Sequence, residues 1–108
     1  MIQITIYKNQ EAYQEVKCIG HAEYDDSGKD IVCASVSVLV INSINAVEVL
    51  TEDAFTLDTN ESTGLIDMTF TEPISHDGQL LMDALVLGLT EIQKQYGNTY
   101  FTLNIEEV

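Results

Sequence analysis

The chain has 108 residues, which is enough for one domain with its own hydrophobic core. Four lysines, no arginine and eighteen carboxylates give a formal net charge of −14, which argues against nucleic-acid backbones and anionic membranes as partners because both are polyanions. A basic protein or peptide is the partner that this charge favours, although an acidic surface also serves solubility alone.

The number of cysteines and the first residues of the chain indicate the cellular compartment in which the protein folds. Two cysteines are too few for a disulfide scaffold, and residues 1–10 alternate polar and apolar side chains where a signal peptide needs a continuous apolar core. The longest apolar run, 31–41, is interrupted by Ser35 and Ser37, so we expect no membrane-spanning segment. We therefore expect a cytoplasmic protein with reduced thiols.

The first quarter of the chain has the period of two β-strands that pair as a hairpin. Residues 2–7 alternate apolar and polar side chains, and a second strand over about 14–23 places Cys18 and Gly20 on one face and His21 on the other. An offset of three sends Cys18 and His21 to opposite faces of a strand. This argues against a shared metal and predicts that Cys18 is a buried hydrophobe.

A polar loop and a long helix follow. Residues 24–30 contain turn-forming side chains and no apolar period, so they predict an exposed loop. Asp30 is the expected N-cap of a helix over about 31–50, because a run of this length without Gly or Pro exceeds the usual length of a strand. The many apolar side chains of this helix predict that it is mostly buried.

The second half of the chain repeats the order of hairpin and helix. Residues 54–59 and 64–70 alternate as two strands joined by a short polar turn. Ser75 is the expected N-cap of a second helix, and Gly97 is its expected C-cap. The inward side chains of the second strand are expected to be Ile66, Met68 and Phe70.

Residues 99–107 alternate again as a closing strand, so the predicted order is ββαββαβ. We expect one α+β domain over residues 1–108, a two-layer sandwich of two helices on one side of a five-stranded mixed or antiparallel sheet. The second helix has more apolar surface than such a domain needs. Its other face carries Met82, Val86 and Leu87, and some of this face is expected to meet a second subunit.

His21 and Cys33 are the reactive side chains that one loop can bring together. A thiol beside an imidazole is the minimum for nucleophilic catalysis. With Asp30 as N-cap, the unpaired N–H groups and the dipole of the helix start would favour the thiolate of Cys33 and receive an oxyanion. Ser37, one turn further on, either orients the substrate or the imidazole or simply bonds a backbone carbonyl.

Two motifs carry a resemblance to a known family. They are Gly20-His21-Ala22 and Gly28-Lys29-Asp30-Ile31-Val32-Cys33-Ala34, followed by Ser35 and Ser37. Over its whole length the chain resembles the bacterial ribosomal-processing cysteine proteases of the Prp family.

The resemblance implies a Cys/His endopeptidase that removes a short N-terminal extension from the large-subunit ribosomal protein twenty-seven. Cys33 matches the nucleophile of the family, His21 matches its histidine, and Ser37 matches a serine beside them. Gly20 and Gly28 match glycines that flank a mobile loop, which suits our expectation that residues 24–29 form a lid. The family also implies a homodimer, and we expect no cofactor and no metal.

Three other interpretations stay open. The chain is a non-catalytic, ribosome-associated binding module if His21 and Cys33 are merely neighbours. It is a redox sensor if Cys33 has a resolving cysteine close by, which the predicted burial of Cys18 disfavours. A zinc site built from Cys18, His21, Cys33 and His76 is the least favoured, because strand geometry divides the first two.

Overall fold

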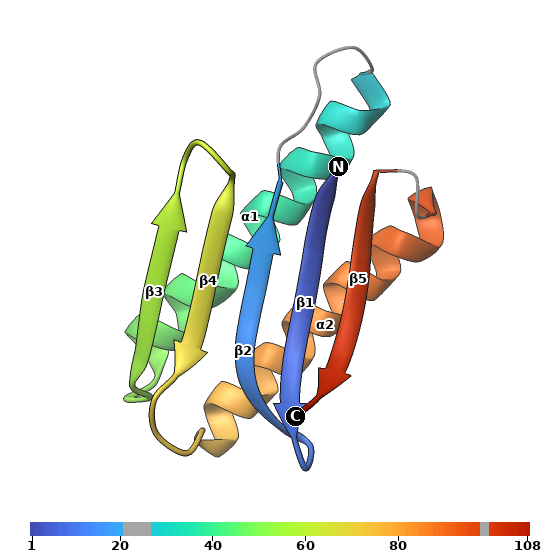
Figure 1. The fold of residues 1–108 in the computed structure, drawn as a ribbon. Helices are drawn as coiled ribbons and strands as arrows, with labels where there is room; N and C mark the ends of the chain where they lie inside the picture. Colours follow the sequence, from blue (N-terminus) through green and yellow to red (C-terminus); the bar gives the residue numbers. More distant parts are fainter. Residues whose placement is uncertain (21–26, 98–99) are drawn as a thin grey trace.

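The computed structural model describes residues 1–20, 27–97 and 100–108. Its elements follow one another in the predicted order ββαββαβ (Figure 1). They are β1 (Ile2–Asn9), β2 (Ala12–Ile19), α1 (Ser27–Leu50), β3 (Phe55–Asn60), β4 (Leu65–Phe70), α2 (His76–Tyr96) and β5 (Phe101–Glu107).

The five strands form one mixed sheet in the order β3-β4-β2-β1-β5. β1 pairs parallel with β5, and the other neighbouring pairs are antiparallel. Both helices cover the same face of the sheet, and the opposite face carries no helix (Figure 1). This arrangement confirms the predicted α+β sandwich.

The core lies between the sheet and the two helices, and alternate strand residues supply its floor. Ile2, Ile4 and Ile6 of β1 are buried, whereas Gln3 between them is exposed. In β4, Met68 and Phe70 are buried and Ile66 packs against them at the edge of the core, as the sequence predicts. The period of two therefore assigns the inner face correctly in both strands.

A bulge in the β1–β2 hairpin adds an anchor for α2. The register shifts between Tyr7 and Lys8, so β2 has one extra residue, and Tyr13 is buried on the helix side. The Tyr13 hydroxyl donates a hydrogen bond of 2.7 Å to Oδ1 of Asp83 in α2. The side chain of Gln79 accepts from the Tyr13 N–H and donates to the Glu11 carbonyl, which fixes the start of α2 against the hairpin.

α1 buries one face and exposes another, which corrects the prediction of a mostly buried helix. Its inner face is a valine stripe at helical spacing, Val32, Val36, Val40 and Val47, and none of these side chains is exposed. The outer face is apolar as well and exposes Ile31, Val38, Ile41, Val49 and Leu50. By length and composition this helix is able to cross a membrane, but here its valine stripe forms part of the core.

Two element boundaries differ from the predicted ones. β2 ends at Ile19, and Gly20 has φ +114°, so the strand alternation that was predicted to continue to residue 23 stops there. α1 begins at Ser27, so the loop predicted over residues 24–30 is wrong for residues 27–30. Asp30 lies within the helix and is not its N-cap, because the sequence 27–30 continues the helix by one turn.

The predicted caps of α2 are confirmed. Oγ of Ser75 accepts the N–H of Gly78 at 3.0 Å and donates to Oδ2 of Asp53 at 2.7 Å, so the cap is tied to the segment before β3. At the other end Gly97 has φ +74°, and its N–H donates to the Gln93 carbonyl at 2.7 Å. Only glycine adopts such a conformation without strain.

The face of α2 that was expected to meet a second subunit is partly core. Met82 is fully buried together with Leu85 and Leu89, so its assignment to an outer face is wrong. The helix rotates Met82 toward the sheet because residues three and four apart share a side. Val86 packs at the edge of the core, and Leu87 alone of the three predicted residues is exposed, at 63 %.

The open face of the sheet contains a pair of carboxyl groups. Glu15 of β2 lies diagonally across from Asp67 of β4, and Lys17 is the partner of Asp67 in the strand register. The hydrogen bond with Asp67, partial burial and the charge of Asp67 together raise the pKa of Glu15 from 4.5 to about 7, against a smaller effect of Lys17. Glu15 therefore keeps its proton up to about pH 7 in the folded protein.

This pair predicts how stability depends on pH. The folded protein holds the Glu15 proton up to about pH 7 and the unfolded chain releases it near pH 4.5, so the free energy of unfolding should fall as the pH rises through this interval. Glu15→Gln should raise the melting temperature at about pH 8 by roughly 2–5 °C and leave it nearly unchanged at about pH 4. Thermal unfolding by circular dichroism tests this against Glu72→Gln, and parallel pH curves for both variants and the natural chain would contradict it.

Candidate active site

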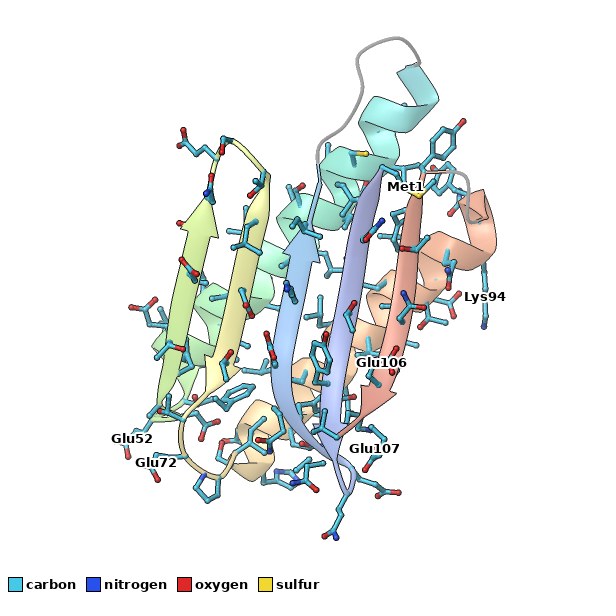
Figure 2. All side chains as sticks on the ribbon, viewed as in Figure 1. Met1, Glu52, Glu72, Lys94, Glu106 and Glu107 are labelled. Atoms are coloured by element: carbon cyan, nitrogen blue, oxygen red, sulfur yellow. The ribbon has the colours of Figure 1, made fainter. Side chains whose placement is uncertain are left out.

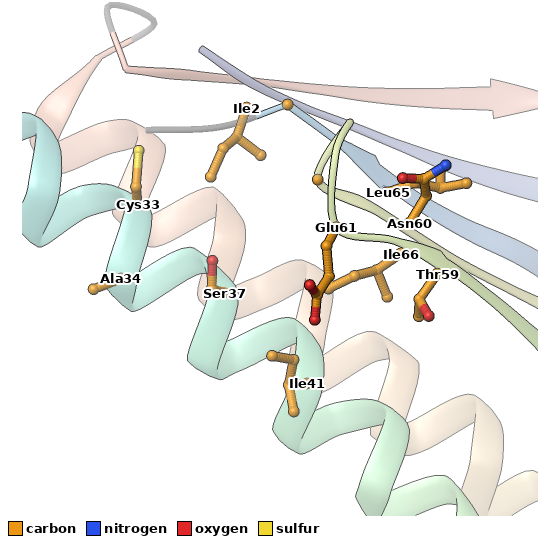
Figure 3. A pocket seen from close by; sticks show the side chains of 12 residues that line it. Ile2, Cys33, Ala34, Ser37, Ile41, Thr59, Asn60, Glu61, Leu65 and Ile66 are labelled. Atoms are coloured by element: carbon orange, nitrogen blue, oxygen red, sulfur yellow. The ribbon is translucent and has the colours of Figure 1, made fainter. Parts of the chain in front are cut away.

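A cavity of about 610 Å³ lies at the end of the sheet where α1 begins its course across the strands. One wall is α1, with Cys33, Ser37 and Ile41 at successive turns. The other walls are the first residues of β1, the end of β2 at Gly20, and the β3–β4 turn (Figure 3). The start of β1, the end of β2 and the β3–β4 turn therefore lie around Cys33, one of the two candidate catalytic residues.

Cys33 lines this cavity from the inner side of α1. It follows Val32 of the valine stripe, so its side chain is only 4 % exposed, and its sulfur points to the cavity end nearest Ile2 (Figure 3). Cys33 is the seventh residue of α1 and not the third, because the helix begins at Ser27. The first four N–H groups of a helix are the unpaired ones, so the predicted activation and oxyanion stabilisation by the helix start do not apply directly at Cys33.

Ser37 lies one turn after Cys33 on the same wall, as the sequence predicts. Ser35 and Ser43 of this helix donate to the carbonyls four residues before them, at 2.8 Å in both cases. Ser37 makes no such hydrogen bond with the described residues, and Figure 3 shows its hydroxyl directed to the cavity. The Ser37 hydroxyl therefore does not bond a backbone carbonyl of the described residues, which was one of its two expected roles. It is free to contact a molecule bound in the cavity.

Gly20 is a structural joint at the edge of the cavity. A Cβ here would lie 2.2 Å from the carbonyl oxygen of Met1, and the φ of +114° strains any other residue. The Gly20 N–H donates to the Thr63 carbonyl at 3.0 Å, which ties the end of β2 to the β3–β4 turn. The backbone at Gly20 is therefore anchored directly at the cavity wall.

The remaining predicted site residues are placed only in part. His21 lies outside the described residues, and so does the segment 24–26 of the predicted lid. Gly28 and Asp30 are in the first turn of α1, so residues 27–29 do not belong to a loop. β2, the strand that contains Cys18, ends at Ile19, two residues before His21.

Cys18 is a buried thiol in β2, as predicted. Burial, and to a lesser degree the charge of nearby Cys33, raise the pKa of the Cys18 thiol to about 11, so it is neutral in the folded protein. Neither cysteine forms a disulfide. Among the described residues no three acidic, histidine or cysteine side chains gather as a metal site, and the side chain of His76 is 92 % exposed at the start of α2.

The sequence analysis missed the contribution of the β3–β4 turn to the site. Asn60 and Glu61 line the cavity opposite Ser37 and Ile41 (Figure 3). In the sequence these residues predict only a turn, because the pairing of β2 with β4 is what moves the turn next to α1. A polar turn facing a cysteine is a tertiary feature that no local pattern contains.

The chain is similar to known proteins over nearly its entire length. Residues 1–101 match the family model described as cysteine protease Prp. The chain is 32% identical to the ribosomal processing cysteine protease Prp of Bacillus subtilis, with 97% of this chain and 99% of the relative covered.

Two solved structures of the Staphylococcus aureus protease Prp have the same fold. The complex with a substrate peptide has a TM-score of 0.88 at 27% identity, and the complex with a covalently linked product peptide has 0.86 at 28%. Each comparison covers 98% of this chain and 100% of the other. From its sequence and from its fold alike, the chain belongs to the Prp family of cysteine proteases.

Proposed function

We propose that the protein is an endopeptidase that removes the N-terminal extension of the large-subunit ribosomal protein twenty-seven, with Cys33 as nucleophile and His21 as base. The observation that carries the proposal is the position of Cys33, whose buried thiol lines the cavity of about 610 Å³ between α1 and the β3–β4 turn. The name of the Bacillus subtilis relative and the peptide complexes of the Staphylococcus aureus protease support the same activity.

The proposed reaction has two stages. His21 takes the proton of Cys33, and the thiolate attacks the carbonyl carbon of the scissile bond. The imidazolium then protonates the leaving amine, so the C–N bond breaks and the extension remains on Cys33 as a thioester. Water, deprotonated by His21, attacks the thioester and releases the extension, which restores the thiol. A covalently linked product in the Staphylococcus aureus relative is consistent with such an intermediate.

Other residues of the cavity support this reaction in the proposal. The Ser37 hydroxyl orients the substrate or the imidazole beside Cys33. Gly20 holds the start of the segment that carries His21, through its bond to Thr63. Gly28 and Asp30 belong to the helix start that follows this segment, and they support the geometry of the site rather than cap the helix at residue 30.

The charge of the protein suits a basic substrate. A formal net charge of −14 attracts a cationic ribosomal precursor over a distance and speeds the encounter, while it disfavours direct contact with nucleic acid. Neither cysteine forms a disulfide, which fits the reducing cytoplasm, where we place the protein. A binding module without catalysis has the same charge, so activity of the thiol is what distinguishes the two functions.

We further propose that the protein is a homodimer that pairs through the outer face of α1. Ile31 and Val38 are 58 % and 67 % exposed there, and Val38 also lines a groove of about 640 Å³ between α1 and α2. Leu39 and Ile92 line this groove. A second copy of the chain would remove this apolar surface from water.

The nucleophile is tested with purified precursor that carries its extension. Cys33→Ala should lower the rate of cleavage by at least about 1,000-fold, because no other side chain replaces the thiol. Mass spectrometry of the product measures the rate, and Cys18→Ala is the matched control that also removes a buried thiol. Normal processing by the Cys33 variant would exclude the mechanism, whereas retained binding without processing is the expected result.

His21 is tested by the reactivity of Cys33. His21→Ala should reduce cleavage by about 100- to 10,000-fold and should raise the pH at which iodoacetamide alkylates Cys33. The buried and neutral Cys18 provides an internal reference in the same mass spectra. An unchanged alkylation profile with full activity would remove His21 from the site.

The dimer is tested by a charge on the outer face of α1. Val38→Asp should convert the dimer to a monomer in sedimentation velocity, because a carboxylate in an apolar interface is costly to desolvate. Val108→Asp adds the same charge at the exposed last residue of the chain and should leave the mass unchanged. A monomeric natural chain at micromolar concentration would contradict the proposal.

A further inference from the structure

Glu61 is the charged side chain among the described residues that line the active-site cavity. It lies in the β3–β4 turn, opposite α1, and Figure 3 shows its carboxylate above the stretch of α1 between Ser37 and Ile41. No lysine or histidine of the described residues lines the cavity or pairs with this carboxylate. Its charge is therefore available to a bound molecule.

The turn that carries Glu61 is held in one conformation. Oδ1 of Asn60 accepts the N–H of Ser62 at 2.9 Å and its hydroxyl at 2.7 Å, which closes the turn around Glu61. The carbonyl of Thr63 accepts the N–H of Gly20 at 3.0 Å, so the turn is also fixed to β2. The backbone of such a braced turn loses little conformational entropy when a ligand binds to Glu61.

The surroundings of Glu61 strengthen an ion pair. Ile2, Ile41, Leu65 and Ile66 supply apolar walls to the same cavity. A peptide that fills the cavity displaces water from these walls, and charges attract each other more strongly as water is excluded. Glu61 is exposed in the free protein, and a peptide that fills the cavity would strengthen its attraction for a cation.

The distance from Cys33 defines which part of a peptide Glu61 meets. Ser37 and Ile41 follow Cys33 by one and two helical turns, which is about 6 and 12 Å along the axis. An extended peptide advances about 3.3 Å per residue. Side chains within about four residues of the bond that Cys33 attacks are therefore in reach of Glu61.

We propose that Glu61 is a specificity-determining residue that binds one lysine or arginine side chain of the peptide substrate, within about four residues of the scissile bond. The inference rests on the proposed peptidase function, because it takes Cys33 as the reacting group. It goes beyond that function by assigning to one turn residue the preference for a basic peptide, separately from the net charge of the protein.

The experiment uses binding, so that it does not depend on turnover. The probes are short peptides with the sequence around the cleavage site of the ribosomal precursor, in which every charged side chain is replaced by glutamine. A single lysine is then introduced at each position in turn. Affinities for the Cys33→Ala protein are measured by fluorescence anisotropy, and cleavage of the same peptides by the natural chain is measured by mass spectrometry.

Glu61→Gln in the Cys33→Ala protein is compared with Glu52→Gln. Both substitutions remove one negative charge, but Glu52 lies at the end of the domain opposite to the β3–β4 turn (Figure 2). We expect the Cys33→Ala protein to bind peptides with lysine at one or two of the positions about fivefold more tightly than the all-glutamine peptide. Glu61→Gln should abolish this preference, and Glu52→Gln should keep it. Glu61→Lys should reverse the preference in favour of a glutamate peptide.

Every other outcome contradicts either the local site at Glu61 or the peptidase function. Equal affinities for all lysine positions, or equal losses in Glu61→Gln and Glu52→Gln, would refute a local site at Glu61 and leave only long-range attraction. Absence of binding by every peptide would refute it too, because the cavity would then not accept a peptide. A lysine preference that depends on Glu61 without cleavage by the natural chain would support this inference and overturn the peptidase function.

Discussion

The rest of the site depends on the packing of the valine stripe of α1 against the sheet. Val32, Val36 and Val40 are fully buried, and burial of one such side chain contributes about 1.5–3 kcal/mol. These contacts fix the rotation of the helix about its axis, since any turn of the helix would expose them. With that rotation set, Cys33 and Ser37 fall at the edge of the buried face and line the cavity. The energy that stabilises the fold is thus also what orients the proposed nucleophile.

A second constraint fixes the walls of the cavity that face this helix. Gly20 bonds the β3–β4 turn and leaves no room for a side chain beside Met1. The end of β2, the start of β1 and the turn are therefore locked together on the wall opposite α1. A peptide between the two walls would meet residues whose backbone positions are already determined, which lowers the entropy lost on binding.

Negative charge in this protein acts at three different ranges. The net charge of −14 acts over distances of the order of the Debye length, about 10 Å at moderate salt, and affects the encounter with a basic partner. Glu15 and Asp67 interact directly on the open face of the sheet, where their proximity raises a pKa. Glu61 acts at the rim of the cavity, where it is exposed to solvent and faces α1. Glu106 of β5 pairs in register with Tyr7, at the end of β1 away from Ile2 and the cavity, and contributes only to the long-range attraction (Figure 2).

The sequence by itself determined the order of the elements, the inner faces of the strands, the caps of α2 and the motif around Cys33, because each follows from local periodicity or from residue types at fixed spacing. It did not determine where α1 begins, since polar residues 27–30 suit a loop as well as a first helical turn. It misassigned Met82, because which of two apolar faces becomes core depends on the rotation of α2 against the sheet. The contribution of Glu61 to the cavity was beyond its reach altogether. Glu61 reaches the cavity only because β4 pairs with β2, which places the β3–β4 turn next to α1. Contacts between segments so far apart in the sequence are set by the tertiary structure.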